Sequence, residues 1–104
     1  MMDEQVLETI MGLIIYSGNA KSDAMEAIAA AKTGDFTQAE KKMISAEESL
    51  VQAHRTQTEQ LAEEAKGNHM AVTLLAVHSQ DHLMTTMTFI DIAKEIIELY
   101  KRVG

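Results

Sequence analysis

The stretch Lys-Thr-Gly-Asp-Phe at residues 32–36 decides the fold, because it ends one long helix and starts another. A glycine directly after a helix readily adopts the left-handed conformation that caps the C-terminus, and an aspartate can cap the N-terminus of the next helix. Gly34 and Asp35 occupy these two positions, and Gln38 follows three residues later, as in a capping box. The stretch therefore predicts a short turn between two helices.

The residues before the turn predict a first helix from Asp3 to Lys32. Apolar side chains recur there at three- and four-residue spacing, and the basic residue at the end suits the helix dipole. Small residues in the middle cost helix propensity, so we expect a neighbouring helix to come unusually close at that point. These small residues are Gly12, Ser17, Gly18 and Ala20.

Two further helices are predicted after the turn. One runs from Phe36 to about Lys66, with a single narrow apolar stripe and otherwise charged, solvated faces. Gly67-Asn68 ends it, and the last helix runs from His69-Met70 to about Arg102. The expected architecture is all-α, an antiparallel three-helix bundle with helices of roughly 30 residues each.

The last helix has an apolar face that covers about half of its circumference, by the periodicity of an α-helix. A bundle of only three helices buries a smaller part of each helix, so we expect this face to contact another copy of the chain. Its apolar residues include Val72, Leu75, Leu83, Ile90, Ala93, Ile97 and Tyr100. Self-association is therefore predicted from the residues alone.

Composition limits the class of protein. A chain of 104 residues with 46% hydrophobic content makes one domain, spanning residues 1–104. It contains no cysteine, which excludes disulfides and thiolate zinc sites and favours a cytoplasmic location. The net charge of −7 argues against nucleic acid and anionic lipid as partners, and no apolar run approaches the ~20 residues of a membrane span.

Polar side chains interrupt the apolar face of the last helix in the stretch AVHSQDHLMTT, residues 76–86. On an α-helix, His78, Asp81 and His82 lie on the same side as apolar neighbours such as Phe89. Burying a carboxylate or an imidazole without a partner costs about a few kcal/mol or more. We therefore expect these groups to meet other polar groups or to bind a ligand.

The preceding helix offers such groups. In an antiparallel hairpin that turns near Asn68, His54 is expected level with His82, and Gln57 level with Ser79. Together with His78 and Asp81, these side chains would form one polar layer between the two helices. His54 and Gln57 would then complete the hydrogen bonds of the layer.

The chemistry of this layer leaves three alternatives open. His-x-x-Asp-His is similar to the inverted zinc-peptidase motif His-x-x-Glu-His, but its carboxylate is one carbon shorter and no third protein ligand is evident. A neutral imidazole can instead act as a nucleophile that carries a phosphoryl group, and the residues alone do not choose between His78 and His82. A helical interaction module without catalysis is the remaining alternative.

The stretch at residues 76–86 resembles the active-site signature of the lactose/cellobiose-type enzyme IIA of the bacterial sugar phosphotransferase system. The resemblance continues in order along nearly the whole chain. The other matching stretches are MGLIIYSGNA at 11–20, GDF at 34–36, AHRTQT at 53–58 and IELY at 97–100.

This resemblance implies a homotrimer of three-helix subunits in which His78 accepts a phosphoryl group from the phosphocarrier protein HPr. His78 would then pass the group to the cysteine of a cognate enzyme IIB, for uptake of a β-disaccharide. Gln80 and His82 are implied as neighbours of His78. Asp81 is implied near the three-fold axis, where carboxylates can hold Mg²⁺; the transfer itself needs no cofactor. The stretch at 11–20 resembles the cellobiose/chitobiose branch more than the lactose branch.

Overall fold

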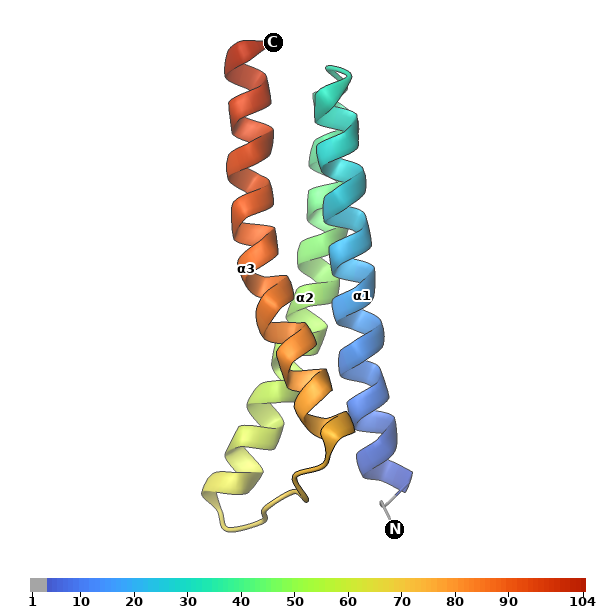
Figure 1. Cartoon of the computed structure of the whole chain (residues 1–104), viewed down its shortest axis with the longest axis vertical. Coiled ribbons are helices and arrows are strands. Elements are labelled where there is room, and N and C mark those ends of the chain that lie inside the picture. The colour runs from blue at the N-terminus through green and yellow to red at the C-terminus, as the bar shows by residue number, and fades with distance from the viewer. Residues whose placement is uncertain (1–3) are drawn as a thin grey trace.

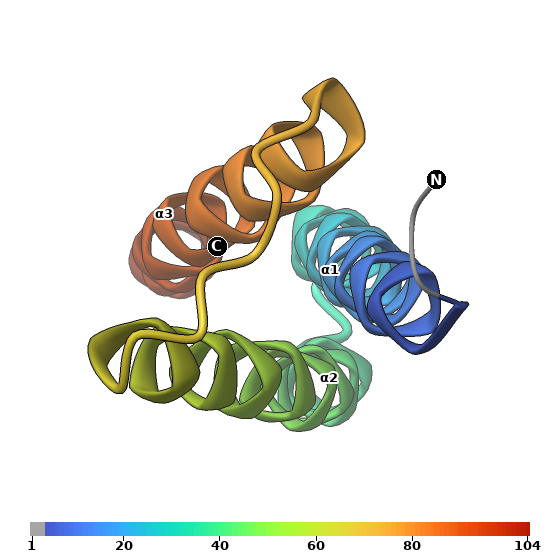
Figure 2. The ribbon, with the colours of Figure 1, turned by 90° about the horizontal axis from the view of Figure 1, so that it is seen from below.

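The computed structural model describes residues 4–104, which form three α-helices connected by two turns. They are α1 (Glu4–Lys32), α2 (Phe36–Ala65) and α3 (Leu74–Val103). Helix α2 runs antiparallel to α1 and α3, so the first and last helices are parallel (Figure 1). Viewed along its length, the molecule places the three helices at the corners of a triangle (Figure 2). The predicted all-α three-helix protomer is confirmed.

The predicted turn between α1 and α2 is also confirmed. Gly34 adopts a φ of 81°, and the Asp35 carboxylate accepts a hydrogen bond of 3.1 Å from the backbone N–H of Gln38. Gly67, with a φ of 97°, follows the end of α2 as expected. The start of α3 was predicted wrongly, because the helix begins at Leu74 and not at residues 69–70. The N-cap is Thr73, whose hydroxyl accepts a hydrogen bond of 3.1 Å from the backbone N–H of Ala76, and this local cap outweighs the helical pattern before it.

Helix α1 packs along both other helices, whereas α2 and α3 meet over a shorter stretch. Figure 1 shows why: α3 crosses α2, its N-terminal end leans toward α1, and the C-terminal end of α2 diverges from it. The core consists mainly of alanines, which let the helices approach closely. They are Ala20, Ala24, Ala27, Ala31, Ala39, Ala46, Ala53, Ala76 and Ala93.

The close approach expected in the middle of α1 is found at Ser17, Gly18 and Ala20 but not at Gly12. Ser17 and Ala20 are fully buried. A Cβ added at Gly18 would lie 3.7 Å from Nε2 of His82, so the glycine faces that imidazole directly. No atom lies within 4 Å of the same position at Gly12. The small residues therefore serve one contact between α1 and α3.

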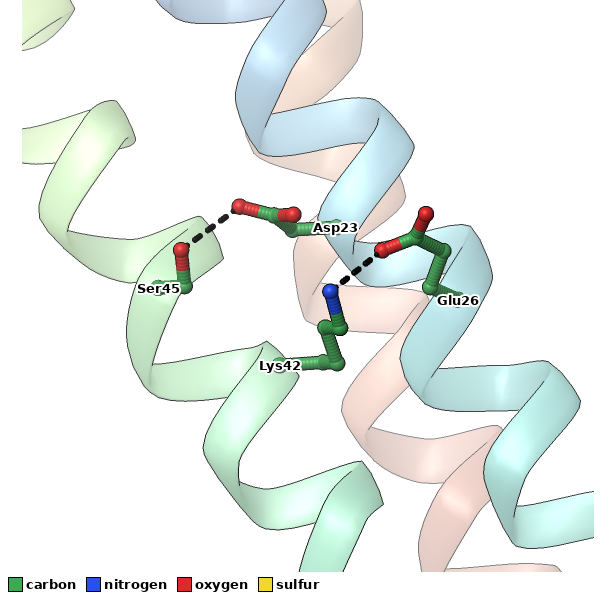
Figure 3. A network of polar contacts seen from close by, with 4 residues as sticks. All are labelled: Asp23, Glu26, Lys42 and Ser45. Atoms are coloured by element: carbon green, nitrogen blue, oxygen red, sulfur yellow. Dashed lines mark hydrogen bonds and ion pairs between the residues drawn. The ribbon is translucent and has the colours of Figure 1, made fainter.

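Polar side chains bridge α1 and α2 in the half of each helix that is closer to the turn between them (Figure 3). The Ser45 hydroxyl donates a hydrogen bond of 2.7 Å to Asp23, and Nζ of Lys42 lies 2.7 Å from a Glu26 carboxylate oxygen. The Glu26 carboxylate raises the pKa of Lys42 by hydrogen bonding and by its charge. Such solvent-exposed pairs contribute little free energy.

The protomer is long and exposes much surface. It measures 52 × 22 × 19 Å and has a radius of gyration of 16.1 Å, where a compact domain of this length has about 13 Å. Its accessible surface is 6846 Å², and a compact monomer of this mass exposes about 5,800 Å². In residues 4–104, no helix is long and apolar enough to cross a membrane.

Candidate functional site

His78 and His82 lie one turn apart on α3 and form a parallel pair. Their ring centroids are 6.0 Å apart and the ring planes differ by 6°. This follows from their spacing, since residues four apart on a helix point in similar directions. His78 is exposed and His82 is half-buried. The two imidazoles therefore differ in how easily another protein can reach them.

The half-buried imidazole of His82 packs against α1. Its Nε2 atom lies beside Gly18, where any side chain would occupy the space next to the ring. A Cβ at this position would be in ordinary van der Waals contact with the imidazole, so His82 packs against α1 at Gly18. The outer ring of the pair, that of His78, remains open to solvent.

Asp81 is exposed on α3. It shares the outward face of this helix with apolar residues that are also exposed, by the periodicity of an α-helix. These are Leu74, Val77, Met84, Ile92, Leu99 and Val103. Within residues 4–104, no three histidine or acidic side chains lie close enough together to hold a metal ion. Asp81 therefore belongs to no such group within residues 4–104.

Gln80 faces away from His78, because residues two apart on a helix point about 160° apart. Its amide lies between two glutamines of α2. Nε2 of Gln57 donates a hydrogen bond of 2.8 Å to Oε1 of Gln80, and Nε2 of Gln80 donates one of 2.7 Å to Oε1 of Gln60. Gln60 was not predicted, although its position three residues after Gln57 places both on the same face of α2.

The predicted single polar layer is wrong. His54 is exposed and lines a groove of about 470 Å³ together with Met87, five residues beyond the predicted partner His82. Asp81 and His78 are exposed instead of buried between α2 and α3. The connection after α2 extends to Thr73, so α3 begins later than predicted and meets α2 in a different register. Of the predicted layer, only the contacts of Gln57 with α3 and of His78 with His82 are found.

Residues 8–101 match the family described as the lactose/cellobiose-specific IIA subunit of the PTS system. The lichenan-specific phosphotransferase enzyme IIA component of Bacillus subtilis (strain 168) is 51% identical over 102 residues, covering 98% of this chain and 93% of that protein.

Two solved structures are also similar. The cellobiose-specific PTS enzyme IIA from Bacillus anthracis has a TM-score of 0.94 and 41% identity, covering 99% of this chain and 94% of the other. The IIA(Chitobiose)–HPr complex of the Escherichia coli phosphotransferase system contains a chain with a TM-score of 0.83 and 40% identity, covering 97% of this chain and 98% of that one. The similarity thus spans almost the whole molecule and agrees with the family that the sequence resembles.

Proposed function

Because the chain belongs to the lactose/cellobiose-specific IIA family of the sugar phosphotransferase system, we propose that it carries a phosphoryl group on His78. The donor is phosphorylated HPr, and the acceptor is the cysteine of a cognate enzyme IIB. Support for the donor comes from the similar chitobiose IIA, which was solved in complex with HPr. Exchange with HPr would take place in the cytoplasm.

The observation that carries the proposal is the exposure of His78 on α3 beside a second, less accessible imidazole. The lone pair of a ring nitrogen of His78 attacks the phosphorus. The bond between phosphorus and the donor's histidine nitrogen then breaks, and the donor nitrogen keeps the electron pair. Transfer between two proteins requires in-line access and donors for the phosphate oxygens, which favours the open His78 over the half-buried His82. His82, 6.0 Å away, is the neighbouring group on the same helix.

The sugar enters only through the partner proteins, since a IIA subunit carries phosphate and does not bind the sugar. The similar proteins are described as specific for lichenan, cellobiose, chitobiose and lactose; the lichenan-specific protein is 51% identical to this chain, and the lactose-specific component of Streptococcus mutans is 42% identical. We therefore assign the protein to uptake of a β-disaccharide of the cellobiose/chitobiose type in preference to lactose.

We further propose that the protomer assembles as a homotrimer. The surface of 6846 Å² and the exposed apolar face of α3 support association, because an elongated alanine-rich protomer leaves large side chains in solvent. Asp81 lies on that face, so three copies would bring three carboxylates together around the axis. Carboxylate oxygens suit Mg²⁺, which would neutralise their repulsion, and the phosphoryl transfer does not depend on it.

The assignment of His78 is tested with phosphorylated HPr. His78→Ala should abolish labelling, whereas His54→Ala, which changes an exposed histidine on α2, should label normally. The bond should be labile in acid and stable in alkali, as a phosphoramidate is. Phosphate located by mass spectrometry on His82 or on a serine would contradict the proposal.

The trimer is tested separately by sedimentation equilibrium. Asp81→Asn should keep the assembly and remove any sensitivity to EDTA, whereas Asp81→Lys should dissociate it, because three ammonium groups would meet without a counter-ion. A stable monomer of 11.5 kDa at micromolar concentration would contradict the trimer. A normal trimer of Asp81→Lys would place Asp81 away from the axis.

A further inference from the structure

The amides of Gln57, Gln80 and Gln60 form a continuous hydrogen-bonded chain between α2 and α3. Gln57 donates to Gln80 at 2.8 Å, and Gln80 donates to Gln60 at 2.7 Å, so both ends of the central amide are used. Methionine sulfurs extend the chain at both sides. Nε2 of Gln57 lies 3.5 Å from Sδ of Met84, and Nε2 of Gln60 lies 3.8 Å from Sδ of Met70. All four contacts join α2 to α3 or to the connection before it.

This hydrogen-bonded chain lies in a region where few other contacts join α2 and α3. Below it, the end of α2 and the start of α3 diverge (Figure 1), and residues 61–69 are exposed. The ion pair between Lys94 and Glu47, at 2.8 Å, joins the same two helices but lies fourteen residues further along α3 than Gln80. The glutamine chain is therefore the polar link between α2 and α3 closest to His78.

His78 lies in the second turn of α3, near the end of the helix that the glutamine chain links to α2. Leu74, the first residue of the helix, is 86% exposed, and the connection before it has no regular structure. The buried residues of these first two turns, Ala76 and Ser79, are small. Orientation of the imidazole thus depends on how firmly this end of α3 is held.

We infer that the Gln57–Gln80–Gln60 chain is a positioning device that holds the first two turns of α3, and with them His78, in the orientation needed for phosphoryl transfer. The inference rests on the proposed phosphocarrier function. In this arrangement Gln80 acts through α2 and the backbone of α3, and not by contact with the phosphoryl group. A misplacement of about 1 Å in a reacting group can reduce a rate by about 100-fold, so a moderate loosening is sufficient to matter.

The chemistry of amides gives a specific test. A primary amide can rotate to exchange its donor and acceptor ends, so the chain can run in either direction. Gln60→Glu keeps an acceptor for Gln80 as observed. Gln57→Glu can also accept a hydrogen bond from Gln80 if the amide of Gln80 rotates to point its NH2 group at residue 57. The amide of Gln60 then rotates to donate to Oε1 of Gln80. With both substitutions, Oε1 of Gln80 faces a carboxylate and the chain cannot form.

The experiment measures single-turnover transfer from phosphorylated HPr over a range of HPr concentrations, at a temperature where circular dichroism shows every variant folded. We expect the double variant to lose about 10- to 100-fold in the saturating rate, and each single variant to lose much less. The half-saturating HPr concentration should change little. A control with Gln38→Glu and Gln52→Glu adds the same two charges at exposed positions of α2 and should transfer normally.

A second variant, Gln80→Met, removes both hydrogen bonds without adding charge and should show the same loss as the double variant. A double variant that is folded and transfers at the wild-type saturating rate would overturn the inference. So would a loss confined to Gln80→Met, because that result would mean that Gln80 acts on the phosphoryl group itself. Failure of the wild-type protein to accept phosphate would instead overturn the proposed function, and the positioning role with it.

Discussion

Thr86 carries a buried hydroxyl group that the fold does not satisfy, and its removal should stabilise the protein. The residue is 1% exposed, and its Oγ1 has no hydrogen-bond partner among residues 4–104. A buried hydroxyl without a partner costs about 1–3 kcal/mol. Thr86→Val has nearly the same shape and removes only this group, so the surrounding core should not need to move.

The expected gain is about 1 kcal/mol or more in the free energy of unfolding. For a domain of this size, 1 kcal/mol corresponds to a rise of about 4–8 °C in Tm. Valine and threonine have similar helix propensities, so the backbone of α3 should contribute little to the difference. Ser17 provides an independent case. Its buried Oγ also has no hydrogen-bond partner within the described residues 4–104, so Ser17→Ala should raise Tm for the same reason.

The assay is thermal unfolding at one fixed protein concentration, because association would otherwise shift Tm. Ser79→Ala is the matched control. Ser79 is equally buried but donates a hydrogen bond of 2.7 Å to the carbonyl oxygen of Ala76, so its removal should bring no gain. A loss of stability in Thr86→Val would refute the reasoning, since it would mean that the hydroxyl has a partner in the folded assembly.

Three further predictions follow from the turns and the surface. Gly34→Ala, at a φ of 81°, should lower the free energy of unfolding by about 1 kcal/mol. Gly12→Ala, with open space around it, should raise the free energy of unfolding by about 0.5–1 kcal/mol. If chemical denaturation shows that Gly12→Ala is less stable than the wild type, a second copy of the chain contacts Gly12. Thr73→Ala should cost about 1 kcal/mol and speed hydrogen exchange at residues 76–80, and unchanged exchange would mean that this cap does not hold α3. The Glu47 carboxylate raises the pKa of Lys94, so the pair should stabilise the fold below the usual lysine pKa and lose this contribution as pH rises through the raised value. Lys94→Met should flatten this alkaline loss in thermal melts, and an unchanged profile would contradict the role of the pair.

The number of helices, the first turn and the candidate carrier residue could all be predicted from the sequence. Capping at Gly34 and Asp35 depends on residues within one turn of each other, so the pattern and the structure coincide there. The periodicity of each helix and the family resemblance can likewise be read from the order of the residues alone. The choice of His78 over His82 came from that resemblance and not from spacing.

The tertiary structure alone decided how the helices meet. The cap at Thr73 lengthens the connection after α2, so α3 meets α2 in another register than a short hairpin would give, and His54 lines a groove with Met87 instead of meeting His82. In this arrangement Gln60 bonds Gln80, and His78 and Asp81 are exposed. Helix periodicity predicts which side chains share a face of one helix. The height and tilt of one helix against another depend instead on the length of the connection and on the close packing of alanines along α1. Height and tilt depend on residues far apart in the sequence. They determine the contacts of His82 with Gly18 and of Gln80 with α2.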